Sequence, residues 1–491
     1  MNIKDDSRKI KKGDTFIALK KNHDGHEYVM DAIRNGASRV IVEKGSYPVD
    51  TVIVSDTHKY LVEYLKNNYY DEIKDLKLIG ITGTNGKTTT AFLIYEAFLN
   101  IGIKAAYIGT IGFYKNGEYR RLNNTTPDIL EIYELLLECS KDSINYVVME
   151  CSSQGLDMNR LSGLHFIYGI FTNLTTDHLD YHKTMENYLN CKLKLFDMCD
   201  RRIINSDSEY SKYFINENTV TYGFDSNDYK ISSYDTLVSK TTFKLNDIVY
   251  ETSLIGLHNI YNLSIVIILF KELNLDLDVS KLYAPNGRMD VIKKDSNLII
   301  VDYAHTPDAV EKIINTALSL KPNNVITIVG CGGNRDKTKR PIMGSIASKL
   351  SSYCIFTSDN PRDEEELSII NDILKGVTKD NYEVIINRKK AIIKGIQKLK
   401  KNDILLVLGK GHEDYQIIKD KRIYFDDKDV TDLPPKNRNI GMVFQSYALY
   451  PHMKVIDNIA FSLKQRGIKK EERHQKAREI AKMLQIEQYL D

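Results

Sequence analysis

The stretch "LIGITGTNGKTTTAF", residues 78–92, decides how this sequence folds. An apolar run of strand type leads into a turn rich in glycine, asparagine and threonine, and the next segment has helical periodicity. Backbone N–H groups at the start of a helix bind phosphate, so this strand–turn–helix unit predicts a nucleotide-binding loop. In such a loop the Lys87 ammonium would reach the β- and γ-phosphates of ATP, and the Thr88 hydroxyl would ligate Mg²⁺.

This loop departs from the usual phosphate-binding pattern G-x-x-x-x-G-K-[ST]. Ile81 stands where the pattern has its first glycine, and the glycine is found at Gly83 instead. The alternative interpretation is a glycine- and threonine-rich turn before an ordinary helix. Because strand, glycines, Gly-Lys-Thr and helix follow one another in the required order, we favour an ATP site on a variant loop.

Length and composition indicate a soluble protein of about three domains. Of the 491 residues, 42% are hydrophobic and 27% charged, as is typical of globular proteins. No apolar run approaches the roughly 18 residues of a membrane helix, and the N-terminus lacks an apolar signal segment. The six cysteines form no C-x-x-C pair, so a reduced, cytoplasmic protein is expected. A net charge of +2 argues against nucleic acid as a partner.

Alternating strand and helix patterns predict an α/β fold. Residues 26–36, "HEYVMDAIRNG", have helical periodicity and end on a glycine. Several expected strands end in polar or glycine-rich loops, and ligands of open α/β sheets bind at the carboxyl ends of the strands. The expected strands are "DTFIALK" (14–20), "ASRVIVEK" (37–44), "DLKLIGI" (75–81), "NYVVMECSS" (145–153), "HFIYGIFTNL" (165–174), "NLIIVDYAH" (297–305), "NNVITIVGCGG" (323–333), "SSYCIFTSDNP" (351–361) and "DILLVLGKG" (403–411).

The order of motifs along residues 3 to about 430 resembles the Mur ligases, and among them the UDP-N-acetylmuramoyl-tripeptide synthetases. The motifs are "DSRKIKKGDTFIALKKNHDGHEYVMDAIRNGA" (6–37), "GTNGKTT" (83–89), "NNTTPD" (123–128), "MECSSQGLDMNR" (149–160), "TNLTTDHLDYH" (172–182), "NGRMD" (286–290), "DYAHTPD" (302–308), "GCGGNRDKTKRP" (330–341), "SDNPR" (358–362) and "GKGHEDYQ" (409–416). The resemblance implies a uridine-nucleotide domain (1–75), a central ATP-binding domain (76–283) and a Rossmann-like amino-acid-binding domain (284–430). The turn-rich "APNGR" at 284–288 agrees with the second boundary.

The resemblance also implies an activity. Members of this family use ATP and two Mg²⁺ ions to add an amino acid to UDP-MurNAc-L-Ala-D-Glu through an acyl phosphate, in cytoplasmic peptidoglycan precursor synthesis. The form expected here adds meso-diaminopimelate and is a monomer that acts on small molecules only. Two alternatives stay open: a sister ligase that takes lysine or a folate, and a folded but inactive chimera.

The residues implied for ATP and metal lie mainly in the central segment. For ATP they are Gly83, Thr84, Asn85, Gly86, Lys87, Thr88, Thr89, Asn259, Arg288 and Asp302. The implied catalytic residues are Lys87, Glu150, His178 and Lys192, and the implied metal ligands are Thr88, Glu150, His178 and Lys192 as N6-carboxylysine.

Simple chemistry supports part of this set. Glu150 ends an apolar strand, where its carboxylate would suit Mg²⁺, although an acid at a helix N-terminus is the plainer interpretation. Composition alone would make Lys192 a solvated helix lysine. Carbamylation needs a neutral amine, and burial lowers the pKa of a lysine in that direction.

For the nucleotide-sugar substrate the resemblance implies neutral hydrogen-bonding residues and one arginine. They are Ser7, Asn124, Thr125, Thr126, Ser152 and Arg160. Asn, Ser and Thr are also common in turns and caps, so their types alone decide little. The sequence departs from the family at Gln154, where histidine is more usual, and at Met158, where some members have a polar contact.

For the incoming amino acid the resemblance implies Arg335, Asp359, Asn360, Pro361, Arg362, Gly409 and Glu413. The "DNPR" form resembles members that add meso-diaminopimelate, whereas lysine-adding relatives lack its arginine. A guanidinium pairs with a carboxylate through two parallel hydrogen bonds. Diaminopimelate carries a second carboxylate at its far end and lysine does not, so Arg362 favours diaminopimelate.

Residues 431–491 follow a different pattern. They resemble an internal fragment of a sugar-importer ABC transporter ATP-binding subunit, around its glutamine loop at Gln445. This segment has no phosphate loop and no L-S-G-G-Q signature, so we expect no ATP hydrolysis from it alone. A rearranged reading frame is the preferred explanation, and a genuine fusion is the alternative.

Overall fold

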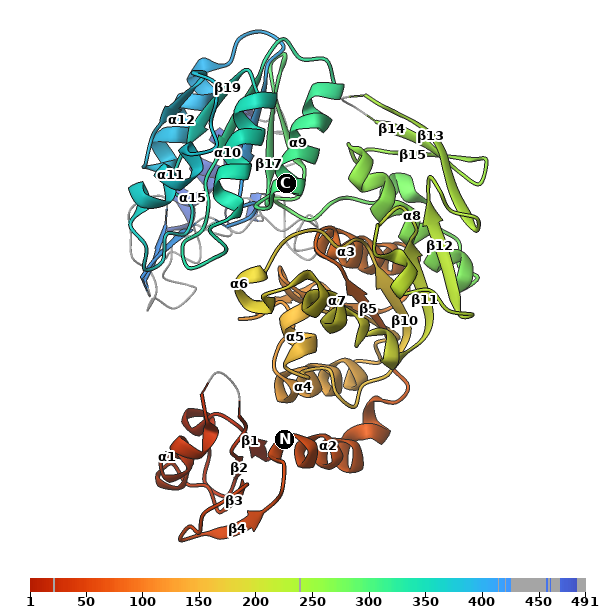
Figure 1. Cartoon of the computed structure of the whole chain (residues 1–491), viewed down its shortest axis with the longest axis vertical. Coiled ribbons are helices and arrows are strands. Elements are labelled where there is room, and N and C mark those ends of the chain that lie inside the picture. Colours follow the sequence, from red (N-terminus) through yellow and green to blue (C-terminus); the bar gives the residue numbers. More distant parts are fainter. Residues whose placement is uncertain are drawn as a thin grey trace. The chain divides into compact units, whose positions relative to one another are not determined.

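The computed structural model describes residues 1–20, 23–237, 240–413, 415–419, 421–424, 456–457, 460 and 469–483. The chain divides into two compact units, residues 1–429 and 430–491. The described part of the first unit contains three large sheets and a small hairpin, with helices packed around them (Figure 1). Among the helices of these described ranges, none is both long and apolar enough to cross a membrane.

The N-terminal sheet consists of four parallel strands in the order β1-β2-β3-β4. They are β1 (Ile3–Lys4), β2 (Thr15–Ile17), β3 (Arg39–Val42) and β4 (Asp50–Ile53). The helix expected at 26–36 begins as the 3-10 helix η2 (Gly25–Tyr28) and continues as α1 (Val29–Arg34). Gly36 follows with a φ of 110°, a left-handed conformation that glycine adopts easily at a helix end.

Helix α2 (Thr57–Ile73) leads from this sheet into the central region. The Asp56 side chain accepts a hydrogen bond from the Lys59 backbone N–H and caps the helix. Leu61 and Leu65, one turn apart, are fully buried. They pack in the same apolar cluster as Ile132 and Leu136 of α4 (Ile129–Lys141).

The central sheet has eleven strands in the order β15-β14-β13-β12-β11-β10-β5-β9-β6-β7-β8. Its parallel part is formed by β5 (Lys77–Thr82), β6 (Ala105–Gly109), β9 (Tyr146–Glu150), β10 (Phe166–Phe171), β11 (Cys199–Asn205) and β12 (Thr219–Gly223). Strand β5 lies between β10 and β9, both parallel to it. The carboxyl ends of these three strands therefore meet at one edge, and the phosphate-loop segment, Glu150 and Thr172 come together there.

The helices of the central region cover the strands β5, β6, β9 and β10, which are buried almost throughout. They are α3 (Lys87–Asn100), α4, α5 (Ser153–Asp157), α6 (Leu179–His182), α7 (Met185–Leu193) and α8 (Leu257–Glu272), with the 3-10 helices η3 (Phe196–Met198), η4 (Ser211–Tyr213) and η5 (Val279–Lys281). Helices α3 and α8 pack against each other through the apolar cluster that includes Phe98 and Phe270.

Both edges of the central sheet differ from the repeated strand–helix units that we expected for residues 76–283. Antiparallel strands extend one edge through β7 (Gly112–Lys115) and β8 (Glu118–Arg120). The other edge ends in an antiparallel meander of β13 (Tyr229–Thr236), β14 (Thr241–Leu245) and β15 (Ile248–Thr252). Their short turns, such as Asn246–Asp247 with positive φ, favour hairpins over helical crossovers.

The third sheet has six strands in the order β16-β17-β21-β18-β19-β20, parallel except for β16. They are β16 (Asp290–Lys294), β17 (Asn297–Asp302), β18 (Val325–Val329), β19 (Tyr353–Phe356), β20 (Tyr382–Val384) and β21 (Ile404–Leu408). Its helices are α9 (Pro307–Ser319), α10 (Lys339–Leu350), α11 (Glu366–Leu374) and α12 (Arg388–Lys398). The hairpin of β22 (Tyr415–Ile418) and β23 (Lys421–Tyr424) follows.

All nine expected strands are confirmed, since each expected segment contains all or nearly all of one strand given above. The second unit is described only in part, including α15 (Lys470–Met483). In it Ile456, Ala460, Ala477 and Ala481 form a small apolar cluster. Gln445 and most of the predicted transporter-like fragment lie outside the described residues, so that resemblance stays a prediction.

Candidate active site

A cavity of about 1200 Å³ lies at the carboxyl ends of the central and third sheets. Residues of both sheets line it, from the phosphate-loop segment to the loops after β17, β18 and β19. All the predicted site residues line this cavity except two, Ser7 and Pro361. Ser7 is buried in the N-terminal sheet region, where its carbonyl accepts a hydrogen bond from the Asn35 side chain. The carbonyl of Pro361 would lie 1.8 Å from a Cβ placed on Gly333, so Pro361 closes the base of a neighbouring loop.

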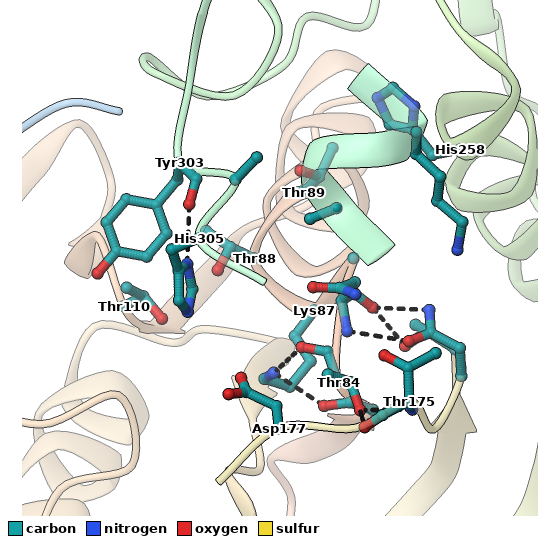
Figure 2. Close-up of a pocket in the computed structure, with 18 of the residues that line it drawn as sticks. Thr84, Lys87, Thr88, Thr89, Thr110, Thr175, Asp177, His258, Tyr303 and His305 are labelled. Atoms are coloured by element: carbon teal, nitrogen blue, oxygen red, sulfur yellow. Dashed lines mark hydrogen bonds between the residues drawn. The ribbon is translucent and has the colours of Figure 1, made fainter. Parts of the chain in front are cut away.

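The phosphate-loop segment turns sharply on its two glycines. Gly83 and Gly86 have φ values of 149° and 88°, and a Cβ on Gly83 would lie 1.9 Å from the Thr172 hydroxyl oxygen. Glycine is therefore required at Gly83, which explains why the loop pattern is displaced from the usual template. Helix α3 begins at Lys87, so the N–H groups of its first turn face the cavity. Figure 2 shows the Lys87 ammonium donating to the carbonyls of Gly83 and Thr84, at 2.8 and 2.9 Å.

Glu150 ends β9 beside this loop and is fully buried. Its Oε2 accepts from the Thr88 hydroxyl at 2.9 Å, and its Oε1 accepts from the Thr110 backbone N–H at 2.9 Å and from the Tyr107 hydroxyl. The Arg288 guanidinium reaches the Thr88 hydroxyl at 3.3 Å from the far side of the cavity. A carboxylate and a hydroxyl oxygen thus lie together next to the phosphate-loop segment.

Lys192, on α7, is 1% exposed. Its ammonium donates to the carbonyl of Gly83 at 2.8 Å, the same oxygen that accepts from Lys87, and lies 4.4 Å from the centre of the Tyr188 ring. Burial lowers the pKa of Lys192 well below its usual value, and the positive charge of Lys87 lowers it further. The composition-based interpretation of a solvated lysine is therefore wrong, and burial shifts this amine toward its neutral form.

His178 lies nearby, in a left-handed conformation with a φ of 55°. Burial lowers the pKa of His178 to about 4, against the opposing effect of the Asp177 carboxylate. Its imidazole is therefore neutral at pH 7 and can offer a nitrogen lone pair. Asp177 is held by Lys339, 3.4 Å away, which comes from α10 of the third sheet.

The predicted nucleotide-sugar residues of the central region form a second wall of the cavity. The Thr126 hydroxyl donates to the Glu150 carbonyl at 2.8 Å and lies 2.9 Å from the Ser152 hydroxyl oxygen. The Arg160 guanidinium donates to the Thr126 carbonyl at 2.7 Å and pairs with Asp128 at 3.0 Å. This wall therefore presents hydroxyls and a partly neutralised guanidinium.

The third sheet contributes a wall that carries both signs of charge. Arg362 donates to the Gly333 carbonyl at 2.8 Å. Burial lowers the pKa of the Arg362 guanidinium, and the positive charge of the nearby Arg335 lowers it further. Asp359 and Glu413 supply carboxylates, and the Asn360 amide donates to Glu413 at 3.0 Å. Arg362 has a φ of 52°, and the hairpin clamps its backbone through Arg362 N to Ile417 O at 2.9 Å.

Among the residues that the structure describes, four hydrogen bonds join the central region to the third-sheet region across the cavity. They are Asn85 to Asp308 (2.9 Å), Lys339 to Asp177 (3.4 Å), Arg288 to Thr88 (3.3 Å) and Arg121 to Tyr415 (2.7 Å). All are polar, and in three of the four at least one partner lines the cavity. The two walls are therefore joined mainly by residues of the site itself.

Several lining residues were missed from the sequence. Thr110, Asp177, Tyr303, His305 and Lys339 line the cavity, and Lys410 lies directly behind it. Figure 2 shows Tyr303, His305 and Thr110 beside Thr88, with the His305 Nδ1–H donating to the Tyr303 carbonyl at 2.8 Å. All but Thr110 lie inside motifs that we quoted, so position within a motif was the available signal.

Comparison with known proteins decides the family. A model described as the Mur ligase middle domain matches residues 81–270, and one described as the Mur ligase glutamate ligase domain matches residues 287–411. A Clostridium botulinum protein named UDP-N-acetylmuramoyl-L-alanyl-D-glutamate–2,6-diaminopimelate ligase is 42% identical over 451 residues, which cover 87% of this chain and 93% of that protein. This chain belongs to the Mur ligase family.

Other Mur ligases agree with this assignment. An Aquifex aeolicus protein of the same name is 42% identical over 441 residues, covering 86% of this chain and 91% of that protein. A solved structure of a protein of that name superposes with a TM-score of 0.62 at 33% identity, covering 87% of this chain and 92% of the other. A Thermotoga maritima MurF ligase in complex with ADP shares the fold, with a TM-score of 0.60 at 18% identity and with 83% and 93% coverage.

Proposed function

We propose that this chain is an ATP-dependent amide ligase that joins meso-2,6-diaminopimelate to the glutamate of UDP-MurNAc-L-Ala-D-Glu. One observation carries the proposal: a single cavity holds a phosphate-loop segment at one wall and a wall with paired guanidiniums and carboxylates at the other. The names of relatives that are 42% identical over most of the chain support it. One chain supplies every proposed site residue, so a monomer suffices for the reaction. We propose that this monomer acts in the cytoplasm.

The work is divided among the regions of the chain in this proposal. Residues 1–75 bind the uridine nucleotide, with Ser7 among the contacts. Residues 76–283 bind ATP and the muramoyl dipeptide, and residues 284–430 bind the amino acid. Residues 431–491, which resemble an internal fragment of an ABC transporter ATP-binding subunit, take no part in catalysis.

ATP binds to the phosphate-loop segment, where backbone N–H groups at the start of α3 meet its phosphates. When ATP binds, the Lys87 ammonium would give up its hydrogen bonds to the Gly83 and Thr84 carbonyls and would contact the phosphates instead. The remaining proposed contacts are those of Gly83, Thr84, Asn85, Gly86, Thr88, Thr89, Asn259, Arg288 and Asp302, all of which line the cavity.

The residues around Thr88 fit a Mg²⁺ ion. Mg²⁺ prefers hard oxygen ligands, and the Thr88 hydroxyl and the Glu150 carboxylate provide two, 2.9 Å apart, next to the phosphate-loop segment. Magnesium supplies charge neutralisation for the phosphoryl group that is transferred. We propose Thr88 and Glu150 as its protein ligands.

A second ion at His178 depends on a chemical change in Lys192. Among the described residues, no three His, Cys, Asp or Glu side chains gather into a metal-binding group. The neutral imidazole of His178 can bind a cation, but an ammonium at Lys192 would repel it. The buried, low-pKa amine of Lys192 can react with CO₂ to form a carbamate, an anionic oxygen ligand, with release of one proton. We propose this form, N6-carboxylysine, in the active protein.

The muramoyl dipeptide lies along the wall of Asn124, Thr125, Thr126, Ser152 and Arg160. Hydroxyls and amides there offer neutral hydrogen bonds, and Arg160 offers a charge-assisted one to an anionic group. The γ-carboxylate of the substrate glutamate then meets the γ-phosphate of ATP. Oxygen of that carboxylate bonds to phosphorus, the bond to ADP breaks, and an acyl phosphate forms.

The amino acid is held at the opposite wall by Arg335, Asp359, Asn360, Arg362, Gly409 and Glu413. Guanidiniums attract its distal carboxylate, and carboxylates attract its distal ammonium. Its other amine attacks the acyl carbon, the carbon–nitrogen bond forms, phosphate leaves and the amine loses a proton. Pro361 shapes this wall from behind without lining the cavity.

The test is phosphate release by the full chain. We expect release only when ATP, Mg²⁺, UDP-MurNAc-L-Ala-D-Glu and meso-diaminopimelate are all present. Release with L-lysine at a comparable kcat/KM would favour a lysine-adding ligase, and release with a folate and glutamate would favour a folate ligase. A folded chain that releases no phosphate with any of these sets would show an inactive chimera.

A further inference from the structure

Lys410 lies in the loop after β21 and is 2% exposed. Its ammonium donates to Asn360 Oδ1 at 2.7 Å and to Glu413 Oε2 at 3.0 Å, and it lies 3.4 Å from Asp359 Oδ1. Each of these three partners lines the cavity, whereas Lys410 does not. A buried cation therefore supports, from behind, three side chains that face the proposed amino-acid site.

These contacts also fix which way the Asn360 amide faces. Its Oδ1 accepts from both Lys410 and the backbone N–H of Ile417, at 2.7 and 2.8 Å. Both donors require an oxygen at that position, so the amide nitrogen must point toward Glu413 Oε2, 3.0 Å away. Without the ammonium, Asn360 Oδ1 would keep one of its two donors, the backbone N–H of Ile417.

The backbone around Lys410 leaves little room for rearrangement. Gly409 has a φ of 107°, and a Cβ on it would lie 2.6 Å from Asp359 Oδ2. A Cβ on Gly287 would lie 2.1 Å from the His412 backbone nitrogen. The loop is thus packed closely on both sides, which holds the ammonium at a fixed place relative to the carboxylates.

The charges balance in the same region. Burial alone would raise the pKa of the Asp359 carboxyl, but the positive charges of Lys410 and Arg388 bring it below its usual value. The Arg388 guanidinium is also buried, and it donates to the Leu408 carbonyl at 2.7 Å. The Asp359 carboxylate therefore remains anionic although it is shielded from water.

We propose that Lys410 is a positioning residue for the incoming amino acid: its buried ammonium holds Asp359, Asn360 and Glu413 in the arrangement that receives the ammonium end of the substrate. The inference rests on the proposed ligase function. Lys410 does not touch the substrate in this proposal. It acts on the affinity for the amino acid and leaves the sites of the other two substrates unchanged.

The experiment compares steady-state phosphate release by the full chain and by Lys410→Met and Lys410→Gln. We expect both variants to raise the KM for meso-diaminopimelate by at least about tenfold, since two carboxylates lose their shared buried cation. The KM values for ATP and for the UDP-MurNAc dipeptide should stay within about twofold of the unmodified chain. Lys410→Arg keeps the charge and should recover part of the loss.

Lys115 provides a matched control. It is also a buried lysine, paired with Glu138 at 2.8 Å and with Asp142, but it lies on β7, outside the cavity. Lys115→Met should lower the melting temperature and leave the KM for meso-diaminopimelate unchanged. This control separates the loss of any buried ion pair from the specific effect of Lys410.

Lys410→Gln keeps a donor for Asn360 and serves as the deciding variant if Lys410→Met does not fold. A KM for meso-diaminopimelate within twofold of the unmodified value, in whichever of these variants folds, overturns the inference. So does an equal rise in the KM of all three substrates. If the unmodified chain itself shows no amino-acid-dependent phosphate release, the proposed ligase function fails instead.

Discussion

Two lysines of this protein are almost equally buried and yet have opposite surroundings. Lys192, in the central region, has a backbone carbonyl and an aromatic ring as neighbours, and among the described residues it forms no ion pair. Lys410, in the third-sheet region, donates to Glu413 and lies near Asp359. Burial alone therefore does not decide the state of a lysine. A neighbouring carboxylate favours the charged form of a buried lysine, whereas burial without one favours the neutral form.

The largest expected effect concerns which amino acid the protein accepts as substrate. If the third-sheet wall is a charged receptor, the full chain should prefer meso-diaminopimelate over L-lysine by roughly 10⁴-fold in kcat/KM, because lysine leaves the half-buried Arg362 guanidinium without a carboxylate partner. Arg362→Ala should reduce that ratio by at least about 100-fold. The measurement is kcat/KM for both amino acids in both proteins. Similar values for the two amino acids in the unmodified chain would refute the receptor.

The next largest effect concerns Lys192. Lys192→Ala should lower kcat by more than about 100-fold, since the loss of a metal ligand exceeds the loss of an outer contact. Added short-chain carboxylates should restore part of the activity by replacing the carbamate. Mass spectrometry of the native protein should find 44 Da more on Lys192 (about the mass of CO₂) and none on Lys410. Carbamate on both lysines, or on neither, would contradict the proposed chemical difference between Lys192 and Lys410.

A smaller effect is expected from the contact that joins the two regions at the hairpin. The Arg121 guanidinium donates to the Tyr415 hydroxyl at 2.7 Å and lies 5.2 Å from the centre of its ring. Arg121→Leu should lower kcat/KM for both the dipeptide and the amino acid by about 3- to 10-fold, which corresponds to about 1 kcal/mol for a partly exposed cation–π contact. An effect on only one substrate would show that the contact belongs to that site alone.

The smallest effect is expected from removing residues 431–491. The hydrogen bonds that Lys192 and Lys410 form among the described residues all lie within residues 1–429. A chain of residues 1–430 should therefore keep kcat and all KM values within about twofold, and its carbamate on Lys192, because the proposed site is complete without the segment. Its melting temperature, measured beside the full chain, should not fall. A lower melting temperature or lost activity would show that the segment is integrated.

Much of this molecule could be predicted from its sequence. The buried strands are continuous apolar runs such as "YVVME", and local patterns of that kind identify them directly. The antiparallel strands β13–β15 escaped prediction because they mix polar and apolar residues with neither a strong apolar run nor a regular alternation. Their pairing depends on the sheet beside them, which is a tertiary property.

The site divides in the same way. Motif position was enough to bring the phosphate-loop segment, Glu150 and Arg362 into one cavity. Lys410 belongs to the motif "GKGHED", but no feature of the neighbouring sequence distinguishes a buried lysine from a solvated one. Its importance follows from Asp359 and Asn360, about fifty positions earlier in the chain. Contacts of this kind, between segments far apart in the chain, cannot be predicted from single motifs.

The backbone of Arg362 limits how this enzyme could evolve a different amino-acid specificity. Its φ of 52° lies in the left-handed region, and the hairpin holds it there through hydrogen bonds on both its N–H and its carbonyl. Glycine and asparagine occupy that region at little cost, whereas β-branched residues are strained there by about 1 to 2 kcal/mol. A lineage that abandoned the guanidinium could therefore move easily to Asn or Gly. Val, Ile and Thr would be reached only after the hairpin itself had changed, so backbone geometry narrows the mutational paths open to selection.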